Sequence, residues 1–212
     1  MDGNQRWALI NNKSKIQGYL SGLNNLKLII NQCIERKIKY LTVYALSTEN
    51  IKRTSSKIIF DLIRKKHKDF LNELLKDDII NINIIGEEKN IPKDILDIFK
   101  LPNKKRNPAI NLNIVFNYGT QDEIIYIVKN ILNNTDKKIN KNTIRSSMYL
   151  GNIPDPDILI RTGGYQRLSN FILLNLSYTE LYFTNTLWPD FNRKNLDDIL
   201  VKFSELNRNY GL

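Results

Sequence analysis

Apolar residues are arranged along the chain in two alternating patterns. Short runs rich in β-branched and aromatic residues are typical of buried strands, and apolar residues spaced three to four apart are typical of helices. The strand pattern covers residues 40–46, 79–85, 110–116 and 158–160. The helical pattern covers residues 20–34, 57–76, 94–99, 123–132, 143–150 and 195–206. Because the two patterns alternate, the sequence predicts an α/β fold with a largely parallel central β-sheet flanked by helices.

The length and composition predict one soluble domain. The 212 residues contain no internal repeat and no linker, so we expect a single domain over residues 1–212. The content of 42% hydrophobic and 25% charged residues is ordinary for a soluble globular protein. No apolar run approaches the roughly 20 residues of a membrane span, and no signal peptide is recognisable. A cytoplasmic location is therefore expected.

The formal charge of +10 suits a polyanionic partner, an acidic membrane surface or a phosphorylated substrate. Part of this excess lies in segments such as 133–142, rich in Lys, Asn and Ile, which weakens it as an argument for nucleic acid. The basic run 64–68 is expected to form a solvated helix face, with His67 packed at its edge. The single Cys33 excludes an internal disulfide and is expected in the core. With one histidine, acid–base chemistry would fall to carboxylates.

The segment 160–171, IRTGGYQRLSNF, has the composition of an anion site. Arg161 and Arg167 flank a sharp turn at Gly163 and Gly164. Two planar guanidinium groups that converge on one point match a phosphate or diphosphate well. Taken alone, the segment fits equally a strand-to-helix loop with exposed arginines.

Two further polar clusters lie at residues 2–6, ahead of a helical pattern, and at residues 47–53, after the strand pattern 40–46. Residues 47–50 are expected to form a polar loop. In an open parallel sheet the carboxyl ends of the strands share one edge, so the three clusters are expected to face one cleft. Asp2 and Glu180 are carboxylates in basic surroundings, which predicts a Mg²⁺ ion that bridges carboxylate and diphosphate oxygens. The alternative for Glu180 is an ion pair with an arginine. The chain has no P-loop motif.

Six motifs, in order and over nearly the whole chain, resemble those of the cis-prenyltransferase (undecaprenyl diphosphate synthase) family. They read MDGNQRW, YALSTEN, LNIVFNYG, PDPDILIRTGG, RLSNF and ELYFTNTLWPDF. The resemblance implies a Mg²⁺-dependent transferase that condenses isopentenyl diphosphate onto an allylic diphosphate such as farnesyl diphosphate. New double bonds would be cis, and the product a polyprenyl, undecaprenyl-type diphosphate, a lipid carrier for cell-wall synthesis. It also implies a homodimer and an apolar tunnel, with the helix after Arg53 as one wall. Transient membrane contact for product release is implied as well, so the expected location is cytoplasmic and peripheral at the membrane.

The resemblance also assigns roles residue by residue. Asp2, Ser47 and Asn50 would be catalytic, and Asp2 and Glu180 would be the metal ligands. Arg161, Arg167 and Ser169 would bind the diphosphate of isopentenyl diphosphate. The remaining substrate-binding positions, centred on the allylic diphosphate, would be Gly3, Asn4, Gln5, Arg6, Trp7, Lys15, Tyr19, Ser47, Thr48, Glu49, Asn50, Ile51 and Arg53.

The chain departs from the family pattern at several of these positions. The family usually has Gly at Gln5, Arg at Lys15, His at Tyr19, Trp at Ile51 and Glu-His at residues 165–166, here Tyr-Gln. The family also has an apolar strand ahead of the MDGN motif. Either translation of the natural chain starts upstream of Met1, which we favour, or the sheet lacks this strand and Asp2 extends from a mobile terminus.

Two alternative functions follow from these observations. The departures are also compatible with a non-catalytic or degenerate subunit of the same fold, which would support activity only with a partner chain. The +10 charge is compatible with a nucleic-acid-binding domain, which would bind with a steep salt dependence. The second alternative gives no reason for Asp2 and Glu180.

Overall fold

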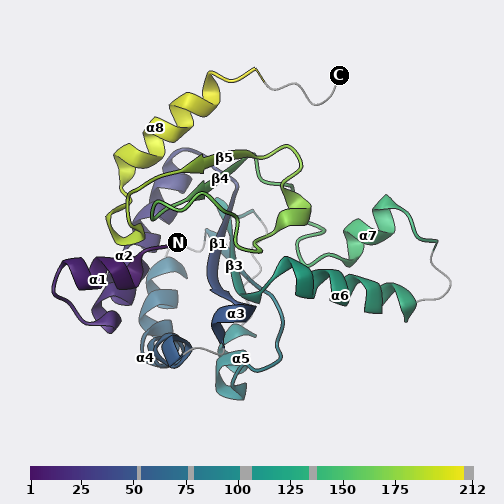
Figure 1. The fold of residues 1–212 in the computed structure, drawn as a ribbon, viewed down its shortest axis with the longest axis horizontal. Helices are drawn as coiled ribbons and strands as arrows, with labels where there is room; N and C mark the ends of the chain where they lie inside the picture. Colours follow the sequence, from purple (N-terminus) through teal and green to yellow (C-terminus); the bar gives the residue numbers. More distant parts are fainter. Residues whose placement is uncertain (52–53, 76–78, 101–106, 134–137, 208–212) are drawn as a thin grey trace.

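The structure is a computed structural model that describes residues 1–51, 54–75, 79–100, 107–133 and 138–207 (Figure 1). Its helices are α1 (Asn4–Ile10), α2 (Lys15–Glu35), α3 (Thr48–Ile51), α4 (Thr54–Leu75), α5 (Lys93–Phe99), α6 (Thr120–Leu132), α7 (Lys141–Ser147) and α8 (Arg193–Ser204). Its strands are β1 (Tyr40–Ser47), β2 (Ile80–Ile85), β3 (Ile110–Tyr118), β4 (Ile158–Arg161) and β5 (Glu180–Phe183). Two 3-10 turns, η1 (Leu173–Asn175) and η2 (Trp188–Asp190), complete the elements.

The strands form two parallel sheets. Strand β3 lies between β1 and β2 and pairs with both in parallel, and β4 pairs in parallel with β5. Helices α1, α2 and α4 lie on one side of the larger sheet, and α6 and α7 extend from the other (Figure 1). The predicted α/β architecture with parallel strands flanked by helices is confirmed. The division into two sheets was not predicted.

One apolar core joins both sheets. Ile30 and Cys33 of α2 and Leu112 of β3 are almost fully buried in it, together with Trp188 and Leu196 from the C-terminal part of the chain. Ile158 and Ile160 of β4 pack against the same cluster. The interpretation of Cys33 as a core residue is therefore confirmed. Shared burial holds the two sheets in one body although no strand pairing joins them within the described residues.

Two other local predictions meet different outcomes. The basic run 64–68 is a solvated face of α4, as expected, because Arg64 donates to Asp94 and Asp61 at the surface and His67 Nδ1 lies 2.9 Å from the Ile63 carbonyl.

Residues 47–50, expected to be a polar loop, instead lead into α3. The loop prediction is wrong because Ser47 Oγ accepts a hydrogen bond from the Asn50 amide at 3.2 Å, a contact that caps the helix.

Helix α4 is the segment assigned by resemblance to the wall of an apolar tunnel. Its Phe60 and Phe70 are buried, and Phe60 lies beside Phe116 of β3, with ring centroids 6.1 Å apart. A cavity of about 110 Å³ opens nearby, with Phe99, Phe116 and Gly86 in its lining. The tunnel itself stays a prediction. No described helix combines the length and the apolar character needed to cross a bilayer.

Candidate active site

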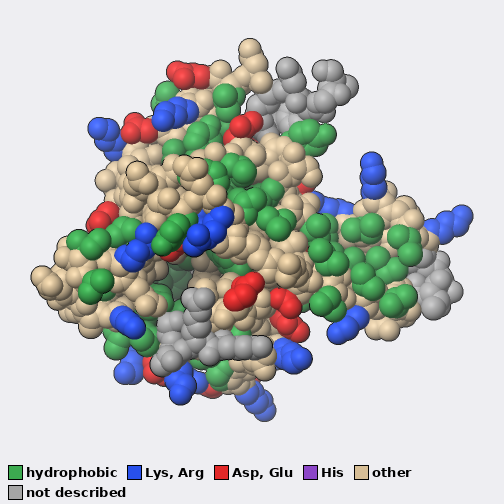
Figure 2. All heavy atoms as spheres, viewed as in Figure 1, with side chains coloured by type: hydrophobic (Ala, Val, Ile, Leu, Met, Phe, Trp, Pro, Cys, Tyr) green, Lys and Arg blue, Asp and Glu red, His purple; other side chains and the backbone are tan. Residues whose placement is uncertain are grey.

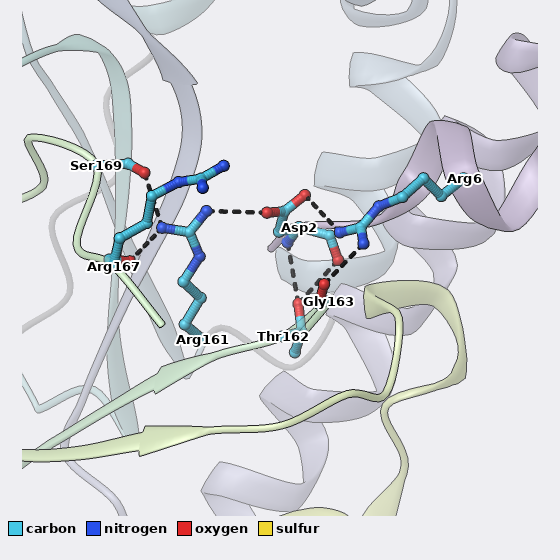
Figure 3. Close-up of polar contacts among 7 residues, drawn as sticks. All are labelled: Asp2, Arg6, Arg161, Thr162, Gly163, Arg167 and Ser169. Carbon is cyan, nitrogen blue, oxygen red and sulfur yellow. Dashed lines mark hydrogen bonds and ion pairs between the residues drawn. The ribbon is translucent and has the colours of Figure 1, made fainter. Parts of the chain in front are cut away.

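Asp2 lies at the centre of a polar cluster built from segments far apart in the sequence (Figure 3). Its amide donates to Thr162 Oγ1 at 3.0 Å, and its carbonyl lies 2.9 Å from the same hydroxyl, 160 positions away. The carbonyl also accepts the Trp188 amide at 2.9 Å. One of our two interpretations expected Asp2 to extend from a mobile terminus. The structure differs, because the residue after β4 and η2 both hold the backbone of Asp2.

The carboxylate of Asp2 lies between two arginines. Its Oδ1 accepts from Arg6 Nη2 at 3.3 Å, and its Oδ2 accepts from Arg161 Nη2 at 3.0 Å. Arg6 stands one turn along α1, and Arg161 ends β4. The Asp2 side chain is about one-third exposed and Arg161 is mostly buried. The single carboxylate therefore orients two guanidinium groups toward a common point.

The loop after β4 completes the cationic side of the cluster. Arg161 Nη1 donates to Ser169 Oγ at 2.7 Å and also to the Arg167 carbonyl, while Arg6 Nη1 donates to the Gly163 carbonyl at 2.7 Å. Gly163 has a φ of +89°, and a Cβ there would lie 2.4 Å from Arg6 Nη2. A side chain at Gly163 would thus displace Arg6, so the glycine is needed for both the turn and the close approach.

Tyr165, in the same loop, contacts three arginines through its ring. The ring centroid lies 4.8 Å from Cζ of Arg6, 5.8 Å from Cζ of Arg161 and 4.1 Å from Cζ of Arg167. Figure 2 shows Lys and Arg side chains close together near the junction of α1 with the β4–β5 unit. Sequence analysis marked Tyr165 only as a departure from the family pattern and missed this contact.

The start of α1 is fixed by its neighbours. Gly3 has a φ of +114°, and a Cβ there would lie 2.8 Å from the Leu187 side chain, so glycine is required. Trp7 Nε1 donates to Asp190 at 2.7 Å, and Gln5 Nε2 donates to the Tyr19 hydroxyl at 2.9 Å. The Asn4 Oδ1 atom is buried, and no described residue forms a hydrogen bond with it.

The carboxyl end of β1 reaches the same region through Asn170. Asn170 Nδ2 donates to Glu49 Oε1 at 2.9 Å, one residue after the Ser169 that contacts Arg161. Thr48 Oγ1 donates to Asp122 Oδ2 at 2.8 Å beside it. The structure therefore connects the three predicted clusters. Asn170 and Thr162, which make these connections, were not among the predicted site residues, although both stand within or beside the segment 160–171.

Some predicted site residues lie outside the cluster. Glu180 begins β5 opposite Ile158, whereas Arg161 lies opposite Phe183, so the parallel register separates Glu180 from the end of β4 where Asp2 is bound. Ile51 is buried in the core beside Leu46 and Phe116. Lys15 is exposed at the start of α2. The prediction for Arg53 falls outside the described residues.

The donor set of the cluster fits one kind of metal site. No group of three or more His, Cys, Asp or Glu side chains is placed to hold a metal within the described ranges. Mg²⁺, however, commonly binds through one or two carboxylates together with substrate phosphates. Asp2, flanked by Arg6 and Arg161, fits a Mg²⁺ ion that is shared with a bound diphosphate and does not fit one held by protein ligands alone.

In a chain that begins at Met1, the α-amino group of that residue lies beside the cluster. Burial lowers its pKa to about 6, with the Asp2 charge acting in the opposite sense and the Arg161 charge adding to the decrease.

Comparison with known proteins gives consistent matches over the whole chain. A family model described as putative undecaprenyl diphosphate synthase, of the prenyltransferase type, matches residues 1–211. An isoprenyl transferase of Treponema denticola is 38% identical over all of this chain and 94% of that protein. The structure of lavandulyl diphosphate synthase from Lavandula x intermedia, in complex with dimethylallyl diphosphate, has a TM-score of 0.90 and 28% identity over 100% of this chain and 95% of that chain. A probable undecaprenyl diphosphate synthase from Campylobacter jejuni has a TM-score of 0.79 and 27% identity over 91% of this chain and 92% of that chain.

Proposed function

The chain belongs to the undecaprenyl diphosphate synthase family of prenyltransferases, and from this premise we propose that it condenses isopentenyl diphosphate units onto an allylic diphosphate such as farnesyl diphosphate. It is a cis-prenyltransferase that makes a polyprenyl diphosphate. The single observation that carries the assignment of the site is the cluster in which Asp2 orients Arg6 and Arg161. In this reaction the allylic C–O bond breaks, diphosphate leaves with the electron pair, and the terminal alkene carbon of the extender forms the new C–C bond with loss of a proton.

We assign the two arginines that contact Asp2 to different substrates. We assign the diphosphate of isopentenyl diphosphate to Arg161, Arg167 and Ser169, because the first contacts the other two directly. Arg6 on α1 is assigned to the allylic diphosphate, together with the backbone at the start of that helix. Since both arginines contact one carboxylate, the two diphosphates adjoin at Asp2. Ser47, which ends β1, and Asn50, in α3, stay assigned to the condensation centre by the family resemblance.

Mg²⁺ is the cofactor that we propose, bound by Asp2 together with a diphosphate. When bound, the ion would supply positive charge to the oxygens of the departing diphosphate. Glu180 stays a predicted second ligand, but the register of β4 and β5 gives it no place beside Asp2 in the same chain. Asp2 is therefore the ligand for which the geometry gives support.

A homodimer is the assembly that we propose. Ile127 of α6 faces the core, but Ile125 and Val128 on the same helix are 53% and 48% exposed. Leu181 and Phe183 of β5 are also exposed. Hydrophobic side chains gather over α6 and α7 on one face of the molecule (Figure 2). Exposed apolar patches of this kind commonly mark protein interfaces, and a second copy is the occupant that the family resemblance implies.

Transient contact with a membrane is proposed through the turn between α1 and α2. Leu9 and Ile10 are 79% and 71% exposed there, and Ile16 is exposed as well. Lys13 and Lys15 lie between them, and residues 9–16 contain no acidic side chain. Apolar side chains next to cations suit an anionic bilayer surface, where a polyprenyl product would be released. The enzyme would accordingly be cytoplasmic and peripheral at the membrane.

Incubation of the purified chain with Mg²⁺, farnesyl diphosphate and labelled isopentenyl diphosphate tests the function. We expect chain-extended products with cis double bonds. Absence of extension would overturn the proposed activity. Extension that occurs only after a partner chain is added would instead support the alternative of a non-catalytic subunit. No structural observation favours the nucleic-acid-binding alternative.

A further inference from the structure

The ring of Tyr165 is the common neighbour of the three arginines in the cluster. Its centroid lies between 4.1 and 5.8 Å from the Cζ atoms of Arg6, Arg161 and Arg167. These arginines come from α1, from the end of β4 and from the loop that follows it. Their mutual repulsion would separate them unless something holds them together. The carboxylate of Asp2 contacts two of them, Arg6 and Arg161, and Tyr165 contacts all three.

An aromatic ring holds guanidinium groups in a different way from a carboxylate. The negative face of the ring attracts the cation without accepting its N–H donors. A carboxylate accepts those donors and cancels one unit of charge. Tyr165 adds no carboxylate to the cluster, and Asp2 supplies the carboxylate that contacts Arg6 and Arg161 in the described part of the chain.

We propose that Tyr165 is a positioning residue that determines the affinity of the cluster for a diphosphate. Its ring contacts the guanidinium groups of Arg6, Arg161 and Arg167 without accepting their N–H donors. The donors that Arg6 and Arg161 do not already give to Asp2, Ser169 and nearby carbonyls therefore stay available to phosphoryl oxygens. Because Arg6 is assigned to the allylic diphosphate and the other two arginines to isopentenyl diphosphate, the ring couples the two subsites. The assignment of the subsites rests on the proposed function, but the affinity for a diphosphate does not.

Titration of the full chain with inorganic diphosphate in a calorimeter tests the proposal directly. Tyr165→Phe keeps the ring and should bind within about twofold of the unchanged protein. Tyr165→Leu and Tyr165→Gln remove the ring without adding charge, and should bind roughly tenfold more weakly. Tyr165→Glu should bind more weakly still. Because Tyr165 is 42% exposed, these changes leave no buried cavity. Tyr40→Leu is the matched control, since Tyr40 is 44% exposed at the start of β1.

Unchanged or tighter binding in Tyr165→Leu and Tyr165→Gln would overturn the proposal. It would also be overturned if Tyr165→Phe bound diphosphate as weakly as Tyr165→Leu. In the condensation assay, loss of the ring should raise the KM for both substrates more than it lowers kcat. The two proposals fail separately. If diphosphate binding depends on the ring but no polyprenyl product forms, the proposed function fails and the role of Tyr165 stands. If product forms and ring-free variants bind normally, the role of Tyr165 fails alone.

Discussion

Gln5 and Tyr19, two residues that differ from the family pattern, are hydrogen-bonded to each other. Gln5 Nε2 on α1 donates to the Tyr19 hydroxyl on α2 at 2.9 Å. The family resemblance implies glycine and histidine at these positions, so each of the two departures supplies the partner of the other. We therefore expect the two departures to be coupled.

Coupling between Gln5 and Tyr19 is testable with a double-mutant cycle. Gln5→Gly and Tyr19→His should each lower kcat/KM for the allylic diphosphate, because each removes one partner of the hydrogen bond. The double variant, which carries the residues that the resemblance implies at both positions, should lose less kcat/KM than the combined losses of the two single variants. The expected coupling energy is about 1 kcal/mol. Strictly additive effects on kcat/KM would show that the two positions are independent.

Removal of the Asp2 carboxylate should nearly abolish turnover while the fold persists. The backbone of Asp2, and not its side chain, makes the contacts to Thr162 and Trp188. Exposed ion pairs contribute about 0–1 kcal/mol to stability, so Asp2→Ala should unfold within a few degrees of the unchanged protein. Turnover should fall roughly a hundredfold or more. Asp69→Asn, which removes an exposed carboxylate paired with Lys66, is the control and should stay active. Normal activity of Asp2→Ala would remove Asp2 from the mechanism.

Negative charge on the exposed face of α6 should dissociate the proposed dimer. Ile125→Asp combined with Val128→Asp places two carboxylates in the proposed interface, where they would lose their hydration. Light scattering should then report the monomer mass of 24.8 kDa in place of twice that value. Val201→Asp alters an equally exposed apolar residue on α8 and should leave the dimer intact. A monomeric unchanged protein, or a dimeric double variant, would contradict the assigned interface.

Polar substitutions in the turn between α1 and α2 should weaken membrane binding. We expect the unchanged protein to sediment with vesicles that contain phosphatidylglycerol and not with neutral vesicles, because Lys13 and Lys15 require anionic lipid. Leu9→Ser with Ile10→Ser should reduce the bound fraction severalfold by removing the apolar contact. Val201→Ser controls for the general loss of an exposed apolar side chain. Equal sedimentation of the double variant would show that the turn is not the contact.

In a chain that begins at Met1, the stability of the fold should rise with pH between about 6 and 8 through the amine of that residue. Its pKa is lowered from 8.0 to about 6 on folding, so the unfolded chain binds a proton in this window that the folded chain does not. The contribution to the free energy of unfolding is at most about 3 kcal/mol, and it is absent below the folded pKa. Urea unfolding of the unmodified and the N-terminally acetylated chain isolates it, because acetylation removes the titration. If the free energy of unfolding changed equally with pH in the two forms, the amine of Met1 would not be the cause of the change.

Most secondary structure could be predicted because it depends on local apolar patterns. Residues 40–46 and 110–116 were predicted as strands and lie in β1 (Tyr40–Ser47) and β3 (Ile110–Tyr118). The burial of Cys33 followed from the same patterns. Helix α3 was missed because four residues are too few to show a helical period. Its formation depends on one contact from Ser47, which a pattern of apolar residues does not contain.

The sequence by itself determined the alternation of most strands and helices, and it marked the three polar segments to which the chemistry is assigned. It also determined the family, because six ordered motifs span the chain. Only the tertiary structure decided which of those residues meet. Asp2 contacts Arg161 across 159 positions, while Glu180 is separated from both by the register of β4 and β5. The role of Tyr165 depends on the turn at Gly163 and Gly164, which directs its ring toward three arginines. Such contacts depend on strand register and loop direction, and neither is encoded in local spacing.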